Sequence, residues 1–185
     1  MPSSILEAWF MIAAQAFELV FRIFHIMAGV AWAGSSFLFT VFIEPGSAKV
    51  GPAAGPMMEE LVGRRKVPEI VTALAAVTVI GGWVLWFNGL SDVGDFGDWI
   101  GSAFGLWLTI GVAATAAFFV GLLGIPPNLK RLNEIGLEVE ASGGPPTEVQ
   151  GAAIGRIQER MRALSRLDLA LLTLAVFAMA TARYW

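Results

Sequence analysis

The sequence predicts an all-α integral membrane protein with four transmembrane helices and a cytoplasmic helical hairpin between the third and the fourth. Only 15% of its 185 residues are charged and 56% are hydrophobic, whereas about 25% of the residues of a typical soluble domain carry a charge. Four apolar stretches are long enough to cross a hydrocarbon core, which takes about 20 helical residues. Basic residues collect in two of the connecting loops. We therefore expect a single membrane domain over residues 1–185.

The four stretches are expected to be helices, because lipid offers a backbone polar group no partner outside its own segment. They cover about residues 17–43, 68–90, 100–124 and 167–183. Residues that start or stop helices bound them, namely Glu44-Pro45, Pro68, Asn88-Gly89 and Pro126-Pro127. A proline at the first helical position is tolerated because the N–H of that residue has no helical partner. We therefore expect Pro68 to open the second span, and Glu44-Pro45 and Pro126-Pro127 to end the first and third.

The distribution of basic residues predicts the orientation of the chain. Four of the twelve Lys and Arg residues lie in the first loop and six in the third, whereas the second loop, residues 91–99, has none. An even number of spans puts the first and third loops on the same side, and the positive-inside rule makes that side cytoplasmic. Both termini are therefore expected outside.

The third loop, residues 125–165, has a helical pattern of its own. A break at residues 142–146 divides it, and Thr147 with Gln150 forms a capping box that opens a second helix. The apolar residues recur at helical spacing: Leu129, Leu132, Ile135 and Val139 before the break, and Ile154, Ile157, Met161 and Leu164 after it. We expect a helical hairpin that extends spans three and four. The apolar stripe is either its packing seam or a groove for a partner.

Small residues recur inside the spans, as in Gly29-x-x-x-Ala33, Gly101-x-x-x-Gly105 and Gly81-Gly82. In lipid, small residues let helix backbones approach closely, which favours helix packing or oligomerisation. They also leave room for a flat cofactor. Both interpretations stay open at this point.

His25, the only histidine, lies about eight residues inside the outer end of the first span, or about 12 Å at 1.5 Å per residue. Ionisable groups at that depth are rare and usually functional. Arg22 is one turn further out and has Glu18 at ion-pair spacing, while Gly29 is one turn deeper on the same face. This arrangement suits a b-type haem, with the iron on His25, a propionate on Arg22 and the ring plane against Gly29.

Met179 and Arg183 in the fourth span lie at comparable depth. Met179 is a candidate second axial ligand, and Arg183 is a candidate second partner for a propionate. The alternative is that Met179 is a core residue and that Arg183, beside Tyr184 and Trp185, anchors the helix at the membrane surface.

Several kinds of chemistry are not expected. There is no cysteine, which excludes disulfides, thiolate metal sites and iron–sulfur clusters. The net charge of -3 does not indicate a nucleic-acid partner. The acidic loop with Asp92, Asp95 and Asp98 lacks the ligand spacing of a calcium loop and is expected to be solvated. With a single histidine and no phosphate loop, no hydrolytic or phosphoryl-transfer site is seen.

The run from His25 to Phe39 reads H-x-x-x-G-x-x-W-x-G-x-x-x-x-F. It resembles the first conserved helix of a superfamily of bacterial membrane proteins that includes the copper-resistance D family, HemJ-type protoporphyrinogen oxidases and the membrane domain of cytochrome c-dependent urate oxidase. The closing residues 179–184 are similar to the end of many small members. The resemblance implies a four-helix fold in the bacterial inner membrane and haem ligation by His25. The Ser-Ser-Phe-Leu-Phe-Thr run after Gly34 departs from the HemJ-type pattern, so porphyrinogen oxidation is not expected.

Three functions are compatible with these residues. The first is a b-type haem-binding subunit that transfers electrons within or to a larger complex. The second is a cofactor-free structural or assembly subunit, in which Glu18, Arg22 and His25 only hold helices together. The third is a small proton-coupled transporter with His25 and Glu18 as the relay. The expected partners are the lipid bilayer and either other copies of the chain or other membrane subunits.

Overall fold

The computed structural model describes residues 5–184, and almost all of them are helical. The elements in chain order are α1 (Ile5–Leu38), η1 (Phe39–Ile43), α2 (Glu44–Val50), η2 (Gly51–Ala54), α3 (Gly55–Met58), η3 (Glu59–Arg64), α4 (Val67–Val93), α5 (Phe96–Gly101), α6 (Ala103–Gly111), α7 (Ala113–Ser142), α8 (Glu148–Thr181) and η4 (Ala182–Tyr184). Four helical segments in this part of the chain are long and apolar enough to cross a membrane. The all-α class and the four apolar helices are therefore confirmed.

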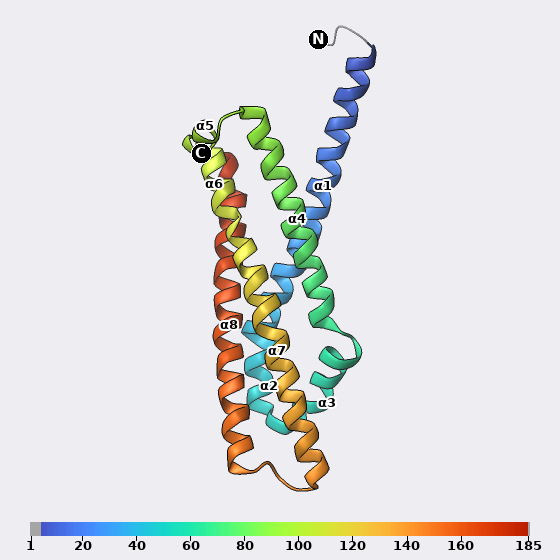
Figure 1. The fold of residues 1–185 in the computed structure, drawn as a ribbon, viewed down its shortest axis with the longest axis vertical. Helices are drawn as coiled ribbons and strands as arrows, with labels where there is room; N and C mark the ends of the chain where they lie inside the picture. The colour runs from blue at the N-terminus through green and yellow to red at the C-terminus, as the bar shows by residue number, and fades with distance from the viewer. Residues whose placement is uncertain (1–4, 185) are drawn as a thin grey trace.

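The long helices run side by side as a bundle, with α4 packed against α1, and α6 and α7 packed against α8 (Figure 1). The N-terminal end of α1 and the C-terminal η4 lie at one end of the bundle, and both the α2–α3 segment and the α7–α8 turn lie at the other (Figure 1). The two basic loops thus share one end, as an even number of spans requires. Which side of a membrane that end faces stays a prediction.

The buried core lies where α1, α4, α7 and α8 meet. Trp32 is its one large residue, only 4% exposed, and the rest are mostly alanines: Ala75, Ala114, Ala117, Leu172 and Ala175. Small side chains at these positions allow the helix axes to come close, which is how membrane helices gain packing contacts in lipid. Helix packing in this part of the bundle thus relies on alanines outside the predicted small-residue patterns.

The first helix is longer than predicted at both ends. It begins at Ile5, not near residue 17, and Glu44-Pro45 does not end it. Residues Phe39–Ile43 form a π-helix in which the Glu44 N–H bonds to the Phe39 carbonyl. Pro45 then stands in the first turn of α2, where its missing N–H costs little. The chain reverses at Gly51, whose φ of 69° favours glycine.

The start of the third apolar helix also differs from the prediction. It begins at Ala103, capped by Ser102, whose hydroxyl oxygen accepts from the Gly105 N–H. Residues Phe96–Gly101 form a separate short helix, capped by Asp95, which accepts a hydrogen bond from the Asp98 N–H at 3.0 Å. A capping role gives the acidic loop a structural function.

Pro126-Pro127 does not close the third helix either, because α7 continues through both prolines to Ser142. Each proline removes one backbone hydrogen bond. Tertiary packing offsets this loss: Gly124 lies against Leu164 of α8, and Ile135 further along is 2% exposed. The Asn128 side chain also donates to the Gly124 carbonyl. The prolines therefore lie in a part of α7 that packs against α8.

The helical hairpin has the predicted geometry. Gly143 ends α7 with a φ of 65°, and α8 runs unbroken from Glu148 to Thr181. The Thr147 hydroxyl accepts from the Gln150 N–H, and the Gln150 side chain accepts from the Thr147 N–H, so the predicted capping box is present. All eight residues of the apolar stripe are buried or half-buried. Their burial favours the packing seam over a partner groove.

Candidate functional site

The histidine lies at the contact between α1 and α4. The Nδ1 atom of His25 is 2.7 Å from the backbone carbonyl oxygen of Thr78. Since a carbonyl only accepts hydrogen bonds, the Nδ1 atom carries the proton. The other ring nitrogen, Nε2, has no hydrogen-bond partner among the described residues. In the neutral imidazole, Nε2 therefore keeps a free lone pair.

Two glycines of α4 make room for this histidine. A Cβ atom at Gly82 would lie 2.9 Å from the His25 Cε1 atom, and one at Gly81 would lie 3.2 Å from the His25 Cβ atom. The imidazole therefore rests directly on the α4 backbone, where no side chain fits. The Gly81-Gly82 pair gives a small-residue contact at this site.

Gly29 is covered by α4. A Cβ atom at Gly29 would lie 3.2 Å from the methyl group of Thr78. The backbone at Gly29 is therefore occupied by helix packing and is not a bare surface for a ring plane in this structure. Thr78 thus contacts two of the predicted site residues, through its carbonyl to His25 and its methyl to Gly29.

Arg22 and Glu18 form the predicted ion pair one turn apart on α1. Their side chains are 59% and 38% exposed in the protein, so neither is enclosed by other helices. His25 lies against Gly82, and α1 and α4 run in opposite directions. Glu18 and Arg22, which precede His25, therefore lie toward the level of Asn88-Gly89 at the end of the apolar part of α4. Arg22 is therefore accessible to an anionic group that approaches α1 from outside the bundle.

Met179 and Arg183 lie elsewhere in the bundle. Met179 packs on Gly111 of α6, where a Cβ atom would meet the Met179 Cε atom at 2.7 Å. Arg183 is exposed in η4, next to α6, whereas the outer half of α1 leans away on the far side of α4 (Figure 1). The structure thus brings together His25, Arg22 and Gly29 on α1 and places Met179 and Arg183 against a different helix.

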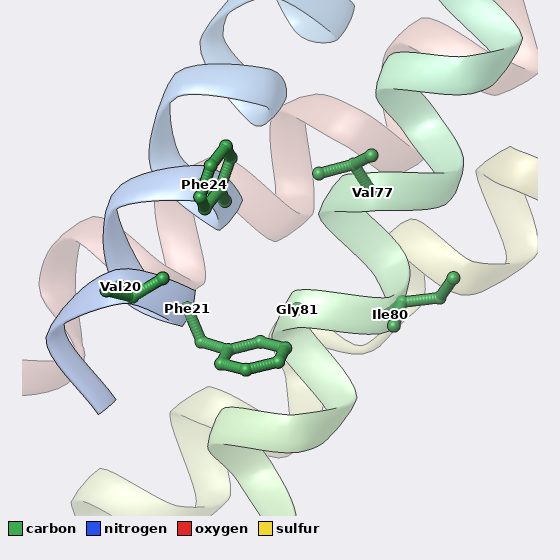
Figure 2. A pocket seen from close by; sticks show the side chains of 6 residues that line it. All are labelled: Val20, Phe21, Phe24, Val77, Ile80 and Gly81. Carbon is green, nitrogen blue, oxygen red and sulfur yellow. The ribbon is translucent and has the colours of Figure 1, made fainter. Parts of the chain in front are cut away.

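An apolar groove of about 380 Å³ lies beside the site (Figure 2). Residues of α1 and α4 line it: Val20, Phe21, Phe24, Val77, Ile80 and Gly81. Val20 and Phe24 stand on a different side of α1 from Arg22 and Gly29, as 3.6 residues per turn requires. The groove offers no polar side chain, so it contributes no ligand or proton donor to His25.

Sequence reasoning missed the most deeply buried charged residue. Asp168 is 6% exposed, and its carboxylate accepts a hydrogen bond from Ser36 Oγ at 2.9 Å. The signal was present as a lone carboxyl group at the start of the fourth apolar stretch. Its partner is on α1, 132 positions away, so no local pattern could reveal the contact.

Within residues 5–184, no three His, Cys, Asp or Glu side chains gather in a way that could hold a metal ion. A single imidazole can still serve as the axial ligand of a haem, whose other four ligands come from the porphyrin. His25 is the residue that could provide such a ligand.

No match to this chain was found among protein-family models, curated proteins or solved structures. The fold and the site together define a bundle with four helices of membrane-spanning length and a polar cluster of His25, Arg22 and Glu18 on α1. Its function is therefore inferred from its own residues.

Proposed function

We propose that this protein is a membrane-embedded subunit that binds a b-type haem through Nε2 of His25 and takes part in electron transfer within or to a larger complex. The observation that carries the proposal is the hydrogen bond from His25 Nδ1–H to the Thr78 carbonyl. Histidines that ligate metals almost always donate their other ring N–H to a carbonyl or carboxylate, which fixes the tautomer and the ring orientation.

The surrounding residues support this role of His25. Gly82 leaves space that the imidazole fills, so the ring is held by packing as well as by its hydrogen bond. A bound haem would supply one-electron chemistry at this position. The protein would orient the His25 imidazole and leave its Nε2 lone pair available to bind the iron.

Arg22 would bind a haem propionate from one turn further out. Its guanidinium now pairs with Glu18, and both side chains are open to approach. Arginine is suited to this contact because its planar fork of N–H donors matches a carboxylate. Glu18 would then position Arg22 by holding its guanidinium near the level of the outer surface.

A second axial ligand from Met179 does not follow from this arrangement, because Met179 packs on α6 and His25 on α4. Any further protein ligand to a bound haem would come from another subunit or from a second copy of this chain. The outer half of α1 favours an assembly. Its large apolar residues project beyond the other helices and are about half or more exposed: Ile5, Leu6, Trp9, Phe10, Ile12 and Phe17.

We place the protein in the bacterial inner membrane, with its termini outside and the α7–α8 hairpin in the cytoplasm. The basic loops at one end of the bundle support this orientation. The His25–Arg22 cluster would then lie toward the outer surface and would exchange electrons with a partner on that side.

A visible absorbance spectrum of the purified full-length protein, expressed with added haem precursor, tests the proposal. We expect a Soret band in the wild type, its loss in His25→Ala and its retention in Met179→Leu, the matched control. A colourless wild type, or a band unchanged in His25→Ala, would remove the haem assignment.

The alternative function is a cofactor-free structural or assembly subunit. The N-terminal part of α1 favours it independently of His25, because its exposed apolar residues extend past the ends of the other helices, where another membrane protein could pack (Figure 1). This function predicts a colourless protein that co-purifies with a partner, and a partner lost when residues 5–17 are removed. Retention of the same partner by the truncated chain would argue against it.

A further inference from the structure

We propose that Asp168 and Ser36 form a proton-binding site inside the helix bundle, independent of the His25 site. Three helices build it. Asp168 of α8 is 6% exposed and accepts a hydrogen bond from Ser36 Oγ of α1 at 2.9 Å. Gly121 of α7 faces the other carboxylate oxygen, Oδ1, which would lie 4.0 Å from a Cβ atom there. The carboxyl group is thus enclosed by three helices and bound by one hydroxyl group.

The site has no counter-cation. Within residues 5–184, Asp168 forms no ion pair with a Lys, Arg or His. Each segment around the site has one charged residue close to it along the chain. These are Arg166 on α8, Glu44 at the start of α2, Glu69 on α4 and Lys130 on α7. Arg166 acts on a different carboxylate: burial raises the pKa of Glu44, and the charges of Arg162 and Arg166 lower it in part.

Because no cation pairs with Asp168 in the described part of the chain, the ligand of the site must neutralise the carboxylate. An ionised carboxylate in an apolar interior loses more solvation than one hydroxyl hydrogen bond returns. A metal cation would need several further oxygen ligands, and no three acidic or imidazole side chains gather in the described part of the chain. A proton needs none. The closed site therefore holds the neutral carboxylic acid.

The site lies on the hairpin side of the apolar part of the bundle. Asp168 follows Arg166, the last basic residue before the apolar part of α8, and its partner Ser36 lies eight residues before Glu44, the first residue of α2. We infer that the proton exchanges with water on the hairpin side. Loss of this proton leaves an uncompensated charge, so the contact between α1 and α8 must open to water when Asp168 ionises.

Labelling of the full chain in liposomes with dicyclohexylcarbodiimide, followed by mass spectrometry of the modified residue, tests the proposal. This lipophilic reagent adds to a protonated carboxylic acid in an apolar environment and forms a stable N-acylurea. We expect a label on Asp168 and none in Asp168→Asn. Above the midpoint, labelling should fall by about tenfold per pH unit, as the protonated fraction does.

Glu18 is the internal control, because it lies in an apolar helix but has Arg22 as its counter-cation. It should remain unlabelled at the pH values at which Asp168 reacts. In vesicles with different pH inside and outside, labelling of Asp168 should follow the pH on the hairpin side. This measurement uses the wild-type protein, so it does not depend on the folding of a variant. Absence of label on Asp168, labelling that does not change with pH, or labelling that follows the opposite side would overturn the proposal. Loss of the haem band in His25→Ala would leave these results unchanged.

Discussion

The imidazole of His25 and the backbone of Thr78 are joined by a 2.7 Å hydrogen bond where α1 and α4 pack through Gly29, Gly81 and Gly82. The acceptor is a main-chain carbonyl, so it cannot be removed by a side-chain substitution at Thr78. The contact depends instead on the two glycines that let the helices approach. Changes at those glycines therefore test the site most directly.

Gly82→Ala is expected to displace the His25 ring, because the new methyl group would lie 2.9 Å from Cε1. Overpacking of this kind costs about 1–3 kcal/mol, measurable as a lower midpoint in a thermal or denaturant melt in detergent. Gly34→Ala is the matched control, since nothing lies within 4 Å of its added Cβ atom. Equal stability of the two variants would show that the ring does not rest on Gly82.

The Glu18–Arg22 pair predicts a non-additive pair of substitutions. Removing Glu18 alone leaves an arginine near the membrane without its counter-charge, which we expect to cost about 2–3 kcal/mol if the site is within the hydrocarbon region. The double variant Glu18→Leu with Arg22→Leu should regain most of this stability. Melting of the single and double variants measures the coupling. If a haem is bound, the double variant should fold but show a shifted spectrum and midpoint potential.

Thr147→Ala is expected to weaken the start of α8 by about 1 kcal/mol, because the hydroxyl group that accepts from the Gln150 N–H is lost. Hydrogen exchange should rise at residues 148–151 and remain unchanged near Asp168. Thr173→Ala is the control, since that hydroxyl donates only to the Leu169 carbonyl within the helix. Unchanged protection around Gln150 would mean that the cap does not stabilise this end.

The orientation can be tested with engineered cysteines, because the chain has none of its own. Ser91→Cys and Gly94→Cys should react with an impermeant reagent added outside intact cells, whereas Gly143→Cys should react only after lysis. All three positions are exposed in the fold, so a difference in labelling reports the membrane side. The reverse pattern would invert the proposed topology.

Local and compositional features of the chain were predictable from the sequence alone. The four apolar helices follow from the length of the stretches and from the need of backbone groups for partners in lipid. The capping box at Thr147 and the turn at Gly143 follow from residues that are close in sequence. The Glu18–Arg22 pair also follows, because helix geometry places residues four apart side by side.

Tertiary structure decided what these local rules leave open. Pro45 and Pro126-Pro127 read as stop signals, yet the helices continue, because a π-helical turn accommodates the first and packing against α8 offsets the others. The histidine was visible in the sequence, but its hydrogen bond to Thr78 depends on how α1 and α4 pack. Asp168 meets Ser36 only because three helices converge. Contacts between residues far apart in the chain depend on how whole helices pack. A short stretch of sequence does not specify that packing.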